Sequence, residues 1–154
     1  MKRVRLIGLL VILAISLVFF LNSKPNYDTD QEHKKVHINL ISKQNFPEGK
    51  AFALKLINGS SLTIKQNSVY VSFPIRMQNG SRSNKCKVEA DGNRLDIKPG
   101  EEVSLNVFIP KENYEKSKDL DITRPNLEWK AYFNEVKIEN RFEKMGEIEH
   151  FNEF

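Results

Sequence analysis

The sequence predicts an all-β domain built as a two-sheet sandwich, preceded by one N-terminal transmembrane helix. Two observations lead to this fold class. Short segments from position 36 onward alternate apolar and polar residues, which is the pattern of strands that bury one face. One long uncharged apolar run stands ahead of them, and a helix of that composition is typical of a membrane span.

The apolar run is the first element of the chain. Residues 6–21 read LIGLLVILAISLVFFL and carry no charge. As a helix this run spans roughly 24 Å, and flanking residues can extend it toward the ~30 Å hydrocarbon core. Basic residues stand before it, so the positive-inside rule predicts a cytoplasmic N-terminus and an extracytoplasmic domain. We therefore expect residues 1–23 to be a membrane anchor and the chain to be a single-pass protein of the cell membrane.

A cleaved signal peptide is the alternative interpretation of residues 1–23, and it would make the domain a secreted protein. Leu21, Asn22 and Ser23 do not match the small-residue pattern of a cleavage site. No cysteine follows the run directly, which argues against a lipid-modified cysteine. Both alternatives place the rest of the chain outside the cytoplasm.

The charge distribution argues against a nucleic-acid partner. The net charge is +4, but three of the 24 basic residues stand within the first five positions, before the apolar run. The rest of the chain carries 21 basic and 20 acidic residues, a net charge of only +1. Binding along a phosphate backbone requires several clustered Lys or Arg side chains. The basicity belongs to the anchor, and the membrane is the partner it predicts.

Residues 24–35, KPNYDTDQEHKK, are polar and lack periodicity, which predicts a flexible stalk. His33 stands among acidic residues here, but metal sites need paired ligands at a fixed spacing, and none is present. We expect no metal site and no cofactor.

Strand segments follow, and turn dipeptides separate them. The alternating segments are 36–41, 52–56, 69–75, 86–90, 95–97, 103–109 and 127–133. The tight-turn dipeptides are Asn58-Gly59, Asn79-Gly80, Asp91-Gly92 and Pro99-Gly100. We expect residues 88–97 to form a hairpin and residues 111–126 to cross between the sheets. The strand before Pro74 either ends there or runs along a sheet edge. Seven to eight strands over residues 36–140 fit an immunoglobulin-like plan, with a small closed barrel as the alternative.

The pattern weakens after Phe133. A last strand around Val136 and Ile138 is expected, followed by an acidic-aromatic tail or hairpin over residues 141–154. Its aromatic residues would either fold against the domain or dock onto a partner.

Strand faces predict the core and the candidate contact residues. Trp129 alternates in phase with other apolar residues and should be the central core residue. Cys86 is expected to be a small buried hydrophobe. Phe108 and Tyr132 project from the opposite side of their strands, so we take them as candidate partner-binding residues. Alternatively, they pack under the long connection or the C-terminal tail.

Two segments carry a resemblance to a known class of module. Residues 52–75 place an apolar strand before an Asn- and Ser-containing turn and a second strand that begins at Thr-Ile. Residues 95–110 place a Pro-Gly-Glu turn before a strand that ends in Pro. Over residues 36–140 this resembles bacterial extracytoplasmic immunoglobulin-like modules of the FxLYD type. The residue usage is similar to that of low-GC Gram-positive bacteria. The resemblance implies adhesion, scaffolding or ligand presentation; the Leu-Tyr-Asp signature is absent, so no functional residue is carried over.

Catalytic motifs are absent from the sequence. There is no G-x-S-x-G, H-E-x-x-H, P-loop or paired-cysteine motif, and the three histidines share no nucleophile. We expect no catalytic residues and no enzyme activity. Two function classes remain: an envelope module that binds another envelope protein or a wall polymer, and a structural subunit of a membrane complex that associates through its transmembrane helix.

Overall fold

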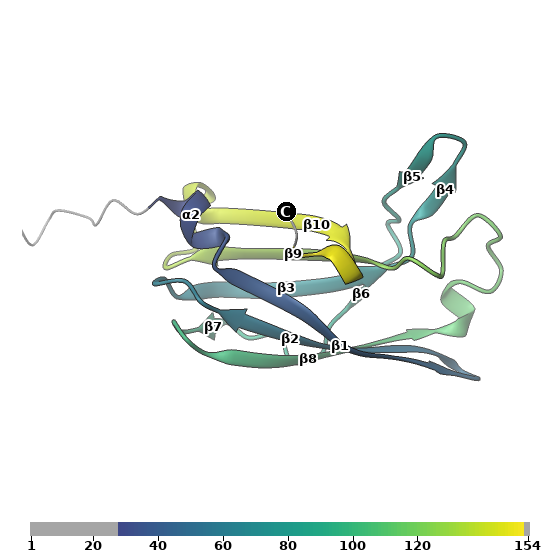
Figure 1. The fold of residues 1–154 in the computed structure, drawn as a ribbon, viewed down its shortest axis with the longest axis horizontal. Helices are drawn as coiled ribbons and strands as arrows, with labels where there is room; N and C mark the ends of the chain where they lie inside the picture. Colours follow the sequence, from purple (N-terminus) through teal and green to yellow (C-terminus); the bar gives the residue numbers. More distant parts are fainter. Residues whose placement is uncertain (1–27, 153–154) are drawn as a thin grey trace, which may run out of the picture.

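The computed structural model describes residues 28–152 (Figure 1). The predicted anchor over residues 1–23 lies outside this range, as do residues 24–27 of the predicted stalk. Among the residues described, none of the helices has both the length and the apolar character needed to span a bilayer.

Antiparallel strands make up most of the described chain, and two main sheets face each other (Figure 1). Sheet A has the order β1 (Val36–Phe46), β2 (Gly49–Asn58), β8 (Glu102–Pro110). Sheet B has the order β10 (Arg141–Glu147), β9 (Asn126–Phe133), β3 (Ile64–Ser72), β6 (Val88–Glu89), with β7 (Asp96–Ile97) also paired to β3. This two-sheet arrangement confirms the predicted all-β sandwich.

Short elements complete the fold. The hairpin of β4 (Ile75–Met77) and β5 (Gly80–Arg82) projects from the end of the sandwich opposite α2 (Thr29–His33) (Figure 1). Three 3₁₀ turns are η1 (Lys111–Asn113), η2 (Ile138–Asn140) and η3 (Ile148–His150). As predicted, the connection from 111 to 126 leads from sheet A to sheet B, and β3 ends before Pro74.

The core lies between the inner faces of the two sheets. In β8 and β9 every second residue is buried, as the alternation predicted. Trp129 is only 1 % exposed, which confirms it as a central core residue. Its indole N–H donates a hydrogen bond of 2.7 Å to Oδ1 of the buried Asn67, so the one polar atom of this side chain is satisfied.

The predicted hairpin over residues 88–97 is wrong. Instead of pairing with each other, β6 and β7 both pair with β3, at opposite ends of that strand. The turn at Asp91 is held against β8, because Asp91 and Asn106 exchange backbone hydrogen bonds of 2.7 and 3.0 Å. Gly92 has a φ of 95°, and a Cβ there would lie 2.5 Å from the carbonyl oxygen of Ser104. The dipeptide closes a crossing between the two sheets instead of a hairpin.

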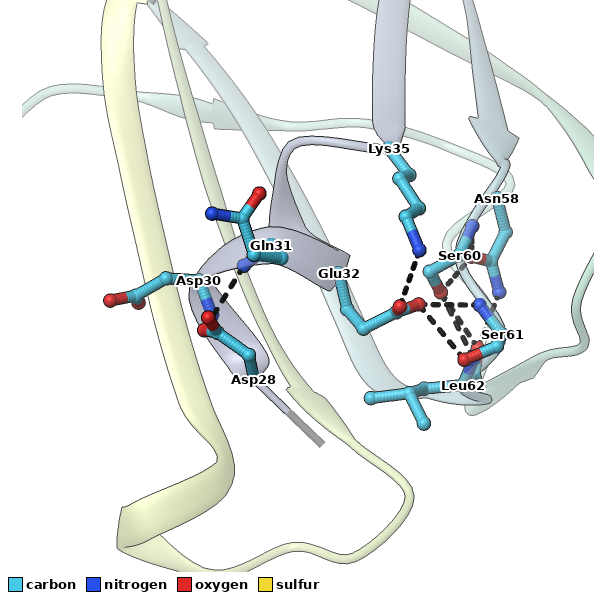
Figure 2. A network of polar contacts seen from close by, with 9 residues as sticks. All are labelled: Asp28, Asp30, Gln31, Glu32, Lys35, Asn58, Ser60, Ser61 and Leu62. Atoms are coloured by element: carbon cyan, nitrogen blue, oxygen red, sulfur yellow. Dashed lines mark hydrogen bonds and ion pairs between the residues drawn. The ribbon is translucent and has the colours of Figure 1, made fainter. Parts of the chain in front are cut away.

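The prediction of a flexible stalk is wrong for residues 28–35, which form α2 and its connection to β1. Asp28 caps the helix through its side chain, which accepts from the backbone N–H groups of Asp30 and Gln31. Glu32 is buried, and one of its carboxylate oxygens accepts from Ser61 N–H at 2.6 Å and from Ser61 Oγ at 3.0 Å (Figure 2). Lys35 donates to the other oxygen at 2.5 Å. The helix is therefore fastened to the turn between β2 and β3.

The turn between β2 and β3 is held by its own hydrogen bonds and lies close to the chain after α2. Asn58 is fully buried, and its amide nitrogen donates to the carbonyl oxygens of Leu62 and Ile97 at 2.9 and 3.0 Å. Ser60 donates to Asn58 Oδ1 at 2.6 Å (Figure 2). A Cβ at Gly59 would lie 2.5 Å from the carbonyl oxygen of Lys35, so only glycine allows the chain after α2 to pass this closely.

His33 attaches α2 to the aromatic residues of sheet B. Its ring stacks on Trp129 with centroids 5.8 Å apart, and it lies 5.2 Å from the ring of Phe142 on β10. Burial, and then the positive charge of Lys144, lower the pKa of His33, while Asp30 opposes the shift. The imidazole is therefore neutral at pH 7 and acts as an aromatic cover over the core.

The C-terminal segment folds back as a hairpin. Residues 141–147 form β10, which pairs with β9 along its whole length. Ile148 and Phe151 are each 2 % exposed, and the Asn152 side chain bonds the backbone N–H and C=O of Ile38 on β1, both at 3.0 Å. Residues 138–140 form η2, where a strand had been expected. Phe142 and Phe151 of the acidic-aromatic segment thus fold against the domain, and residues 153–154 lie outside the described residues.

Cys86 is exposed and lies in the connection between β5 and β6, so the prediction of a buried strand residue is wrong. The strand begins two residues later, at Val88.

Candidate binding site on the outer face of sheet B

The two candidate contact residues lie on different sheets. Phe108 is on β8 of sheet A, is 44 % exposed, and borders a small hollow of about 250 Å³ on the outer face of that sheet. Tyr132 is on β9 of sheet B, is half-buried, and borders a larger hollow of about 610 Å³ on the opposite outer face. A single compact partner therefore has access to one of these residues, and not to both.

An irregularity in β3 creates the larger hollow. The register of β3 against β9 shifts between Lys65 and Ser68, and Gln66 adopts a φ of 47°. The backbone of the bulge bonds to the segment just before β7. The N–H groups of Gln66 and Asn67 donate to the carbonyl oxygens of Leu95 and Arg94, at 2.8 and 3.1 Å. Such bulges redirect side chains and often lie beside functional sites. Here the bulge holds Arg94 and Leu95 by backbone hydrogen bonds, and residues 93–95 form one wall of the hollow.

The rest of the hollow comes from neighbouring strands. Its floor and walls comprise Gln66, Asn67, Ser68, Tyr70, Glu89, Asn93, Arg94, Leu95, Lys130, Ala131, Tyr132 and Arg141. They come from β3, β6, β9 and β10 and from the wall at 93–95, so most of the width of sheet B contributes. A volume of this size falls within the range of small-molecule sites in proteins.

Two asparagines hold fixed positions in this hollow. Asn67 donates through Nδ2 to Oδ1 of Asn93 at 2.8 Å, and the same oxygen accepts from Val69 N–H at 3.2 Å. Asn93 donates through Nδ2 to the carbonyl oxygen of Ala90 at 3.0 Å and to the carboxylate of Glu89 at 3.2 Å. Because Asn67 also accepts from Trp129, the amide network connects the hollow directly to the core. Side chains held by several hydrogen bonds lose little entropy when a ligand binds.

Ion pairs hold the charged side chains on the β9 and β10 side of the hollow. Lys130 lies 2.6 Å from Glu128 and 3.3 Å from Glu143, and Arg141 lies 2.9 Å from the other oxygen of Glu143. The hydrogen bond to Glu128 raises the pKa of Lys130. Burial favours the neutral acid at Glu128, but hydrogen bonds from Lys130 and Lys87 lower its pKa nonetheless. The opposite charges of these groups largely neutralise one another.

Two tyrosines stand at the ends of the hollow. Lys87 Nζ lies 4.5 Å from the centroid of the Tyr70 ring and covers one of its faces. Tyr132 has no ring stacking and no cation over it from any residue between 28 and 152. Tyr132 therefore offers an apolar ring face beside a set of fixed polar groups.

The groups in the hollow can bind, stack and donate hydrogen bonds. His33 lies over Trp129 on the other side of the sheet, and His37 is exposed on β1, so neither reaches the hollow. Between residues 28 and 152, no three His, Cys, Asp or Glu side chains gather in a way that would hold a metal ion.

The bulge was missed from the sequence, although a signal for it exists. Ile64 and Val69 are both fully buried on β3, yet they are five positions apart. In a regular strand, residues separated by an odd number point to opposite faces. Two core residues at an odd spacing therefore require an extra residue between them.

Comparisons with known proteins identify no family for this chain. No protein-family model and no curated protein matches the chain. Among solved structures, a β-glucosidase from Kluyveromyces marxianus in complex with glucose is similar over 73 % of this chain and 14 % of its own, at 12 % identity and a TM-score of 0.33. The archaellum periplasmic stator protein FlaG from Sulfolobus acidocaldarius is similar over 72 % of this chain and 99 % of its own, at 10 % identity and a TM-score of 0.32. The chain thus spans a small part of the glucosidase, and these scores are too low to support a functional inference.

Proposed function

We propose that the chain is a single-pass membrane protein whose extracytoplasmic domain is a binding or accessory module of the cell envelope. The N-terminus is cytoplasmic, and residues 6–21 are the transmembrane helix. The domain has an immunoglobulin-like plan of the kind found in FxLYD-type modules. It presents a surface to a partner, an envelope protein or a wall polymer, and carries out no catalysis.

The observation that supports binding most is the hollow on sheet B. A β-bulge lies in the sheet beneath the hollow, a network of fixed amides borders it, and the half-buried Tyr132 lines it. Placing Asn67 and Asn93 in one network limits the freedom of both side chains. Preorganised polar groups around an apolar platform are what a binding site needs.

The attachment of the domain is consistent with this role. The chain enters the sandwich through α2, which is fixed by Glu32 and His33, and the hollow lies on the outer face of sheet B. A docked helix at the point of entry fixes the position at which the chain joins the sandwich.

Photo-crosslinking in intact cells tests the proposal. A photoreactive amino acid replaces Tyr132 in the full-length chain, and a matched variant carries it in place of Phe108 on the opposite face. We expect a crosslinked product from position 132 that position 108 does not give. Equal capture at both positions, or capture at position 108 alone, would contradict the assignment of the binding face.

A further inference from the structure

We infer that the hollow on sheet B binds an uncharged saccharide chain; this inference rests on the proposed binding function and names its ligand class. Three properties of the site lead to it: the position of the hollow within the sheet, the balance of its charges, and the chemistry of its fixed groups.

The position argues against a peptide. Peptides that bind to sheets commonly add a strand to a free edge, where backbone N–H and C=O groups are unpaired. The hollow lies over β3 and β9, and both strands have a paired neighbour on each side. The site therefore lies mainly on a sheet face, and the edge strands β6 and β10 contribute one side chain each, Glu89 and Arg141.

The charge balance argues against a polyanion. Lys130 and Arg141 border the hollow, but both are already paired with the carboxylates of Glu128 or Glu143. Arg94 also borders the hollow, and the negative charge of Glu89 beside Asn93 offsets it. Recognition of a polyanion requires an excess of cationic side chains. Binding one here would mean breaking existing ion pairs.

The fixed groups match the chemistry of a sugar. A pyranose ring has apolar C–H faces and a rim of hydroxyl groups, so it needs an apolar platform with hydrogen-bonding groups at its side. The Tyr132 ring is such a platform. The carboxylate of Glu89, which the amide of Asn93 holds in place, and the guanidinium of Arg94 are planar groups beside the hollow that can bond to hydroxyls.

The dimensions allow more than one sugar ring. Tyr70 pairs with Glu128, and Tyr132 is four residues farther along β9. At the rise of a β-strand, that separation is about 13 Å. A short oligosaccharide lying along β9 would thus extend from Tyr132 toward Tyr70, with Lys130 and Ser68 beneath it.

Trp129 supplies a built-in reporter of binding. It is the only tryptophan in the chain, and its indole N–H is bonded to Asn67, which borders the hollow. A ligand that contacts the amide network should shift the indole N–H resonance without touching the indole itself. This signal separates binding in the hollow from binding elsewhere on the surface.

The test uses the full-length chain in detergent, titrated with chitotetraose, cellotetraose and maltotetraose and followed by calorimetry and the indole resonance. We expect at least one of these sugars to bind and to shift the resonance. Tyr132→Ala should weaken binding at least about tenfold, Tyr132→Phe should retain it, and Phe108→Ala should leave it unchanged. Thermal melting of each variant verifies that it is folded.

Two other results would overturn the inference. Absence of binding by all three sugars is one, and tighter binding of polyglutamate or polyphosphate is the other. If position 132 still crosslinks to a protein in cells while no sugar binds, the binding function stands and the saccharide ligand is wrong. If position 132 captures nothing and no sugar binds, both proposals fail.

Discussion

Single residues in this domain have one of two roles, depending on the sheet face they occupy. Trp129 and Lys130 are neighbours on β9, yet the tryptophan is 1 % exposed and the lysine lies on the outer face in an ion-pair network. Because side chains alternate along a strand, one residue packs in the core while the next lies on the outer face.

This separation gives the first prediction. Trp129→Ala should lower the free energy of unfolding by about 3–5 kcal/mol, because it leaves a cavity and an unpaired Asn67 oxygen. Lys130→Ala should cost less than about 1 kcal/mol, because Lys130 lies on the outer face and Glu128 keeps its ion pair with Lys87. Chemical denaturation of both variants checks the difference, and similar losses would show that the strand faces are assigned wrongly.

Asp121 is the second residue whose surroundings define its role. It is 3 % exposed, and its carboxylate accepts from Thr123 Oγ1 at 2.6 Å and from the guanidinium of Arg124 at 2.9 and 3.0 Å. Arg76 on β4 lies 3.4 Å away. The hydrogen bond from Thr123 is the main reason that the pKa of Asp121 lies far below its usual range, and burial opposes that shift. The residue fixes the connection between the sheets to the projecting hairpin.

Asp121→Asn should therefore cost about 1–3 kcal/mol of stability, because the buried acceptor loses its charge and part of its hydrogen bonding. Asp119→Asn, an exposed neighbour in the same connection, is the matched control and should be within about 0.5 kcal/mol of the unmodified chain. Equal unfolding midpoints for the two variants would mean that the Asp121 network contributes nothing to stability.

At the scale of elements, α2 shows how tertiary contacts can decide a structure that local sequence does not. Five residues form too little helix to be stable in water by themselves. The helix exists because Glu32 bonds to Ser61 and His33 stacks on Trp129. Both partners are distant in sequence, so a polar segment that reads as a stalk becomes part of the fold.

The pH dependence of stability tests this docking. The folded-state pKa of His33 is lowered, so at acidic pH the unfolded chain binds a proton that the folded chain excludes. Stability should be full above about pH 6.5 and should fall as the pH drops below that value. His33→Phe keeps an aromatic cover without titration and should reduce this loss.

Thermal unfolding between pH 7.5 and 5.5 is the measurement. His37→Gln, at an exposed position on β1, should keep the pH dependence of the unmodified chain. A His33→Phe variant that loses as much stability on acidification as the unmodified chain would show that another group is responsible.

Elements whose structure follows from local alternation were predicted correctly. The strand with which each short segment pairs was not. The strands β1, β2, β8 and β9 follow from alternation, because burying one face fixes their period. Asp91-Gly92 has the local signature of a hairpin, but the edge of β3 was available to both flanking segments. Cys86 falls in an exposed connection for a similar reason, since only the two residues of β6 pair with β3.

The candidate site was predictable only in part. Tyr132 was identified because it lies opposite the core on β9, and it does border the hollow. The bulge at Gln66 and the wall at residues 93–95 depend on pairing between β3 and a distant segment. Alternation within a single strand therefore predicts the aromatic residue but not the amide network beside it.

The whole molecule combines a folded domain with an apolar segment that lies outside the described residues. Both termini of the described domain close the same side of the sandwich, since α2 covers Trp129 and Asn152 bonds to β1 (Figure 1). The chain therefore has a defined entry point next to its C-terminal end. The location of the domain in the cell depends on the segment that precedes this point.

That location is the final prediction. The full-length chain should fractionate with membranes, because residues 6–21 are uncharged and nearly long enough to span the hydrocarbon core. Protease added to wall-stripped cells should digest the chain beyond Lys24, because basic residues before an apolar run favour a cytoplasmic N-terminus. Leu13→Arg should reduce membrane insertion, because a charge at the helix centre costs about 2.5–3.5 kcal/mol on the translocon scale. Leu13→Ile, which preserves hydrophobicity, should behave like the unmodified chain. A soluble mature species that begins near Lys24 would instead show cleavage and secretion, and the membrane anchor would then be wrong.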